Sequence, residues 1–279
     1  MKKILPLFLL LGFASSLVSC SNDEDYVPYT PNVKLLPVKI TWVNTSNDEV
    51  MTSVVYSYDD QNRLISKEEV SGDALKITVE LAYNTQGELT KETRSIRYDG
   101  VEGKYLTDMV TEYVHKGSEI LVDFSSKSYV EDELESHLTK EGSIRLNERG
   151  WLDRYDYELT LQYNKKGGML MGDRQWEKFH YDGRGNLLGT AGLDMDVIWE
   201  YEKTREWDNK NGIFVAVNTP QWYLVRTDLN GLNYIVNNMK GVSRYNEEGY
   251  PVEIESQSAA SSVPSQPSQM INIEYVSAK

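Results

Sequence analysis

A seven-residue phrase recurs along the chain and constrains its fold more than any other feature. The clearest copy is 181–187, YDGRGNL, in which Asp182 stands second, Gly185 fifth and Leu187 seventh. Asp or Asn in second place opens a type I turn through its side chain. Gly or Asn in fifth place tolerates the left-handed backbone of a G1 bulge. The phrase therefore predicts a β-hairpin with a three-residue loop.

Five further copies start at Tyr58, Tyr83, Leu146, Tyr163 and Tyr245. In such a hairpin the first residue of each copy lies opposite the seventh, and these cross-strand pairs contribute roughly 0.2–1 kcal/mol over Ala–Ala. One copy carries Asn in fifth place, so we expect Asn to be tolerated at position 185 as well. The motif residues, besides Tyr181 and those named for its copy, are Tyr58, Asn62, Leu64, Tyr83, Gly87, Leu89, Gly150, Leu152, Tyr163, Gly167, Tyr245 and Gly249.

Apolar and polar residues alternate between these phrases, as in Leu75–Tyr83 and Tyr155–Tyr163. Period two gives each strand one buried and one solvent-facing side, as in antiparallel sheets. The connections are short, so consecutive strands are neighbours. We predict an all-β fold, a long antiparallel meander of β-hairpins curled into a barrel or half-barrel, as one domain over 38–279. Among its strands we expect Leu134–Thr139, Ile144–Asn147 and Ile213–Val217.

One stretch, Pro220 to Met239, does not alternate. Proline is well suited to the first turn of a helix. We predict one short helix near 220–230, ending before Gly231, that plugs an end of the sheet or lies in its concavity.

The N-terminus has the organisation of an export signal. Two lysines precede the apolar stretch Ile4–Phe13, which is too short to span a bilayer permanently. The residues that follow, 17–20 (LVSC), resemble a bacterial lipobox, in which the cysteine is acylated and becomes the mature N-terminus. Cys20 is the only cysteine in the chain. We predict a signal peptide over 1–19 and a lipidated, acidic and proline-rich tether over 20–37, with an ordinary signal peptide as the alternative.

The tether begins with an acidic run, Asp23, Glu24 and Asp25. A run of this kind after the lipidated cysteine resembles the signal that sends Bacteroidetes lipoproteins to the outer face of the outer membrane. Its simpler reading is a solvated linker. The resemblance implies a lipid anchor in the outer membrane with the protein facing the cell exterior.

The phrase at 181–187 resembles the YD repeat of Rhs-type proteins, and the chain as a whole resembles a family of Bacteroidetes lipoproteins described as having a porin-like fold. The shared features are the lipobox, the scattered hairpins, the late phrase 248–252 (EGYPV) and the final strand ending near Tyr275. Glu248 departs from the Asp of the family phrase. The resemblance implies a porin-like curled sheet and carries no catalytic residue across.

The net charge of the chain disfavours some classes of binding partner. The chain has a formal net charge of −14, which disfavours nucleic acid and anionic membrane surfaces, so we expect membrane contact through the lipid alone. Solubility is the simplest use of this charge.

The sequence contains few of the motifs that catalysis requires. The chain has no Gly-x-Ser-x-Gly elbow, and its three histidines show no paired spacing for a metal. A glycan hydrolase needs two carboxylates at a suitable separation. Among 43 acidic residues such a pair is always present, so its presence is no evidence for that activity. We predict no cofactor, no metal and no enzymatic activity.

Aromatic residues are the one sign of a ligand. The chain has 19 Tyr and 6 Trp, and Trp176, Trp207 and Trp222 are not on clearly apolar faces. Exposed aromatics suit sugar rings, although they also fill cores. Two hypotheses follow: a surface lipoprotein that binds a glycan or envelope component, and a structural or assembly accessory of the envelope with only protein partners.

Overall fold

The computed structural model describes residues 31–101, 103–163, 169–194, 197–202, 207–227, 236–238, 242–256 and 269–279. The predicted signal peptide, Cys20 and the acidic run lie outside these ranges. No helix in the described ranges is long and apolar enough to cross a membrane.

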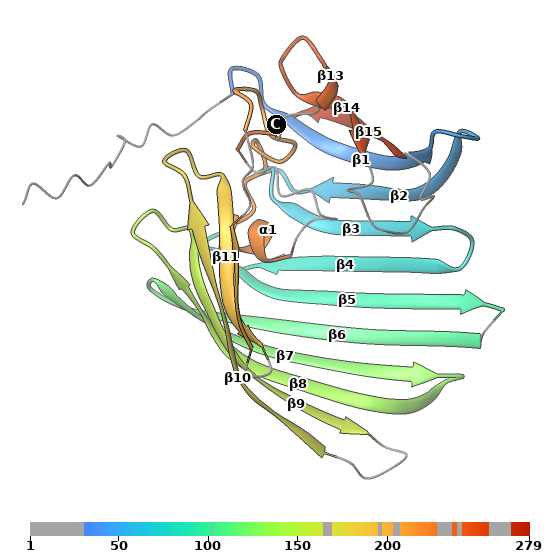
Figure 1. Ribbon diagram of the computed structural model, residues 1–279, viewed down its shortest axis with the longest axis vertical. Helices are drawn as coiled ribbons and strands as arrows, with labels where there is room; N and C mark the ends of the chain where they lie inside the picture. Colours follow the sequence, from blue (N-terminus) through green and yellow to red (C-terminus); the bar gives the residue numbers. More distant parts are fainter. Residues whose placement is uncertain are drawn as a thin grey trace, which may run out of the picture.

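Fifteen strands form one antiparallel sheet, as the alternation predicts. Strands β1 to β12 are neighbours in chain order, and β15 pairs with β1, so β14 and β13 extend the sheet past its first strand. The sheet curls but does not close, because β12 and β13 lie at its two ends among the described residues (Figure 1). The strands are β1 (Leu35–Asn44), β2 (Glu49–Tyr58), β3 (Leu64–Ser71), β4 (Leu75–Tyr83), β5 (Leu89–Gly100), β6 (Gly103–Lys116), β7 (Glu119–Val130), β8 (Glu133–Leu146), β9 (Leu152–Tyr163), β10 (Met169–Tyr181), β11 (Leu187–Asp194), β12 (Val197–Glu202), β13 (Val242–Tyr245), β14 (Pro251–Ser256) and β15 (Gln269–Ser277).

The hairpin phrase forms the predicted turn. In the copy between β10 and β11, Asp182 Oδ1 accepts hydrogen bonds from the backbone N–H groups of Arg184 and Asn186, both at 2.9 Å. Gly185 has φ +97°, and Tyr181 lies opposite Leu187. The same opposition occurs in four other copies: Tyr58 with Leu64, Tyr83 with Leu89, Leu146 with Leu152, and Tyr245 with Pro251.

The copy at Tyr163 differs. Met169 lies opposite Gln162 rather than Tyr163, so the predicted register is wrong here by one residue. Its Gly167 lies outside the described residues. This copy joins β9 to β10, so its turn lies at one end of the strands. The copies that join β2 to β3, β4 to β5, β8 to β9 and β10 to β11 form turns at the other end.

Two strand predictions need correction. The strands expected at Leu134–Thr139 and Ile144–Asn147 are one continuous strand, β8. Gly142 lies opposite Tyr157 within it, and a Cβ at this glycine would lie 2.4 Å from the carbonyl oxygen of Asp156. Glycine therefore lets β9 approach β8 closely rather than ending the strand.

The strand expected at Ile213–Val217 is a turn instead. Four of its five residues are buried, which explains its strand-like apolar composition: Ile213, Phe214, Ala216 and Val217. Because this segment packs against the inner face of the sheet, its side chains are buried without strand pairing.

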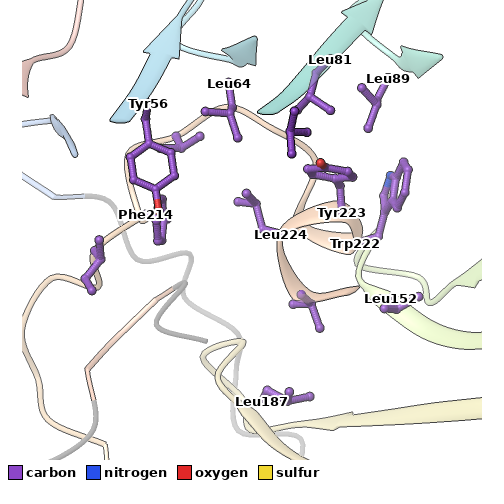
Figure 2. Packing of buried hydrophobic residues seen from close by; sticks show 14 of the residues in the cluster. Tyr56, Leu64, Leu81, Leu89, Leu152, Leu187, Phe214, Trp222, Tyr223 and Leu224 are labelled. Atoms are coloured by element: carbon purple, nitrogen blue, oxygen red, sulfur yellow. The ribbon is translucent and has the colours of Figure 1, made fainter. Parts of the chain in front are cut away.

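The predicted helix is present as α1 (Gln221–Arg226), and Pro220 precedes it as the N-cap residue. It lies in the concavity of the sheet (Figure 1). Tyr223 and Leu224 point among leucines of the neighbouring strands (Figure 2). Hydrogen bonds join this segment to the hairpins, since Leu152 N–H donates to Gln221 Oε1 at 3.0 Å and Leu64 N–H to Thr219 Oγ1 at 2.8 Å. The helix and the preceding loop thus complete a core that the sheet alone leaves open.

Candidate functional site

The three tryptophans expected to face a ligand lie in different surroundings. Trp222 is only 3% exposed and packs edge-on against Tyr113, with ring centroids 5.0 Å apart. The prediction is wrong for Trp222, which belongs to the core because α1 turns it toward the sheet. Trp207 is half-buried against the same core. Trp176 is half-buried under Arg154, whose guanidinium carbon lies 4.6 Å from the ring centroid.

A different place gathers the side chains that can bind a ligand. Between α1 and the inner face of the sheet lies a cavity of about 210 Å³, which we call the concave hollow. Its lining residues are Glu92, Arg94, Met109, Thr111, Phe124, Lys140, Tyr155, Arg226 and Thr227.

Strand register builds the floor of the concave hollow. Glu92 lies opposite Thr111, Thr111 opposite Phe124, and Phe124 opposite Lys140, on the successive strands β5 to β8. Directly opposed residues share a face of the sheet, and neighbouring strands lie about 4.8 Å apart. Glu92 and Lys140 therefore stand at the two sides of a floor formed by Thr111 and Phe124.

Glu92 is held at one side by cations. The residue Glu92 is 5% exposed. Its carboxylate lies 3.0 Å from Arg94 Nη2 and 4.0 Å from Arg226 Nη2. Tyr113 donates its hydroxyl hydrogen to Glu92 Oε2 at 3.4 Å and accepts one from Arg226 Nη2 at 2.5 Å. Burying a carboxylate costs several kcal/mol unless it is paired, and these contacts supply the pairing.

Lys140 is at the other side. Its ammonium lies 3.8 Å from the ring centroid of Tyr157, and no salt bridge joins it to another residue in the described part of the chain. Burial, together with the positive charge of Arg226, lowers the pKa of Lys140 to about 8. Its charge therefore titrates close to neutral pH.

Two further donors lack partners. The Nε–H groups of Arg94 and Arg226 are buried and make no hydrogen bond within the described ranges. A buried unpaired donor costs about 1–3 kcal/mol, more when it is charged. These two Nε–H groups do not reach the cavity surface, but the Arg94 side chain is 32% exposed and that of Arg226 is 18% exposed, so other parts of both side chains can meet a ligand. The arrangement is suited to binding.

The opposite face of the sheet carries a larger depression of about 880 Å³ over β6 to β11, which we call the outer groove. Its apolar floor includes Val114, Leu121, Trp176 and Leu193. Along one side the carboxylates of successive strands face one another, in the order Glu112, Asp123, Glu141 and Glu158.

The histidines have ordinary surroundings. His115 Nε2 lies 2.8 Å from the carbonyl oxygen of Leu89, and His137 Nε2 lies 3.3 Å from Ser125 Oγ. Within the described residues, no group of three or more His, Cys, Asp and Glu side chains could hold a metal ion.

Comparisons with known proteins identify no family. No protein-family model matches this chain, and no curated protein matches it by sequence. Two porin-like proteins are among the solved structures that match this chain. A porin-like protein from Bacteroides vulgatus ATCC 8482 is 11% identical with a TM-score of 0.39, over 86% of this chain and 98% of the other. A porin-like protein from Bacteroides uniformis ATCC 8492 is 12% identical with a TM-score of 0.33, over 89% of this chain and 99% of the other.

Proposed function

We propose that this protein is a non-catalytic binding protein of the cell envelope, anchored in the outer membrane by a lipid on Cys20 and facing the exterior. Its concave hollow binds part of a glycan or of another envelope component. The observation that carries this proposal is the cavity itself, in which the partly exposed side chains of Arg94 and Arg226 lie beside aromatic rings.

The surroundings of the hollow support binding. The donors stand on paired strands and on a helix packed into the core, so little conformational entropy is lost when a ligand binds. Tyr155 and Phe124 add apolar surface next to those donors, a combination that suits a sugar ring.

A glycan array and a pull-down from envelope fragments test this function. We expect the purified protein to retain a ligand, and Arg94→Ala to weaken that retention because it removes a donor from the hollow. Arg97→Ala is the matched control, since Arg97 is an exposed arginine of the same strand whose side chain is on the opposite face. Equal retention by both variants, or no ligand in either screen, would rule the hollow out.

A second function, an assembly accessory with protein partners, is favoured by the outer groove. Its floor includes Val114, which is exposed on β6, and Trp176, four strands away on β10. An envelope protein captured by the wild type and by Arg94→Ala, but not by Trp176→Ala, would support this second function instead.

The proposed lipid anchor on Cys20 can be tested separately from the concave hollow. Cys20→Ala removes the thiol that acylation requires, so the variant should leave the membrane fraction and appear in the soluble fraction. Immunoblots of fractionated cells, with Ser21→Ala as the control, measure this. A variant that stays in the membrane fraction as fully as the wild type would show that the lipid is not the anchor.

A further inference from the structure

The charges around the concave hollow define the chemical group that can enter it. Its lining includes three cationic side chains, Arg94, Lys140 and Arg226, and a single carboxylate, that of Glu92. The whole chain has a formal net charge of −14. The hollow therefore has the opposite sign of charge from the protein around it.

We infer that the group bound in the concave hollow is an oxyanion, a carboxylate or phosphate on a small sugar-like ring, held between Arg94, Arg226 and Lys140. This inference rests on the proposed function and specifies its ligand. Planar guanidinium groups match carboxylate and phosphate oxygens, and an ammonium adds a compact positive charge.

The contacts already made leave donors for such a group. Glu92 engages Nη2 of Arg94 and approaches Nη2 of Arg226, while the side chains of Arg94 and Arg226 remain 32% and 18% exposed. Across the floor, the Lys140 ammonium rests on the Tyr157 ring without a salt bridge to any described residue. An oxyanion over Thr111 and Phe124 would lie between the two arginines and the Lys140 ammonium.

The size of the cavity limits the ligand. About 210 Å³ is less than the roughly 300–1,000 Å³ of sites for drug-sized molecules. One monosaccharide-sized group with its charge fits this space better than a longer chain, whose remainder would extend outside.

The titration of Lys140 adds a pH dependence. The charge of Lys140 interacts with Arg226 of α1 and Glu177 of β10, and it lies near the rings of Tyr155 and Tyr157 of β9. Glu92 and Arg94 of β5 line the same cavity. Burial raises the pKa of Tyr155, so that hydroxyl stays protonated where Lys140 titrates. Oxyanion binding should weaken as the pH rises past about 8, where Lys140 loses its charge.

Three probes with related rings test the inference: glucuronate, glucose 6-phosphate and neutral glucose. Saturation-transfer NMR on the full chain in detergent measures their affinities. We expect one or both anions to bind and glucose not to bind. The stronger of the two anions identifies carboxylate or phosphate as the preferred group.

Two variants move the affinity in opposite directions. Lys140→Met keeps an unbranched side chain and removes the charge, so the bound anion should be about tenfold weaker, as expected when one charged hydrogen bond is lost. It should also lose the pH dependence. Glu92→Gln removes the competing carboxylate and should strengthen binding. Lys178→Met, on an exposed lysine, makes the same change in net charge and should leave the affinity unchanged.

The outcomes separate the two proposals. Glucose binding as well as the anions, with no effect of Lys140→Met, overturns the oxyanion but keeps a glycan site. Failure of every probe, while the protein still retains a ligand from the glycan array, also overturns the oxyanion alone. If Glu92→Gln fails to fold, Lys140→Met and its pH profile decide.

Discussion

Tyr223→Ala is expected to lower the free energy of unfolding by about 3–5 kcal/mol. Tyr223 is 1% exposed, and α1 places it among the leucines of the inner sheet face, as Figure 2 shows. Truncation leaves a cavity that the sheet cannot fill, because each strand is held by its ladder on both sides. Urea denaturation followed by circular dichroism measures the loss.

Tyr105→Ala is the control for this substitution, since Tyr105 has the same side chain and is 43% exposed on β6. Its loss should be well below that of Tyr223→Ala because less apolar surface leaves the core. Equal losses for the two variants would mean that α1 does not contribute to a shared core with the sheet.

Gly185→Val is expected to cost roughly 2–6 kcal/mol, from about 1–3 of backbone strain and about 1–3 of overpacking. Gly185 has φ +97°, and a Cβ there would lie 2.9 Å from Cζ2 of Trp151. The comparison with Asn62 predicts that Asn is tolerated here. Because of the nearby Trp151 ring, we instead expect Gly185→Asn to be costly as well. The left-handed backbone suits Asn, but the Trp151 ring must shift before a side chain fits at this position.

Gly150 provides the matched test, because it holds the same place in its hairpin with φ +75° and has nothing within 4 Å of its Cβ position. Gly150→Asn should cost about 1 kcal/mol or less, since Asn adopts this conformation readily. Urea denaturation of Gly185→Val, Gly185→Asn and Gly150→Asn separates the cost of backbone strain from the cost of crowding against Trp151. Equal costs for Asn at 150 and at 185 would show that the contact with Trp151 has no effect.

The hairpins were predictable because their chemistry is local. Asp182 bonds to N–H groups two and four residues ahead, so seven residues of sequence contain the whole turn. The copy at Tyr163 shows the limit of this reasoning. The phrase is similar there, yet the ladder is offset by one residue, and strand pairing sets that register.

None of the residues that line the concave hollow was a candidate in the sequence analysis. Glu92 and Lys140 occupy inward positions of β5 and β8, and a charged residue among apolar inward positions is a signal that was available. The prediction for Trp222 was wrong because the sequence indicated a helix but not which face of that helix is buried. Arg226 could not be assigned, since its partners Tyr113 and Glu92 are more than 100 residues away in the chain.

Local sequence patterns were enough to predict the antiparallel meander, its turns and most of its strand registers, because period-two alternation and Asx–Gly turn chemistry act over a few residues. Tertiary structure alone decided how far the sheet curls and which segment enters its concavity. Curl accumulates from the twist of every strand pair and from the bulk packed inside. The segment 207–227 supplies that bulk, and the concave hollow exists because α1 brings Arg226 over β5 to β8.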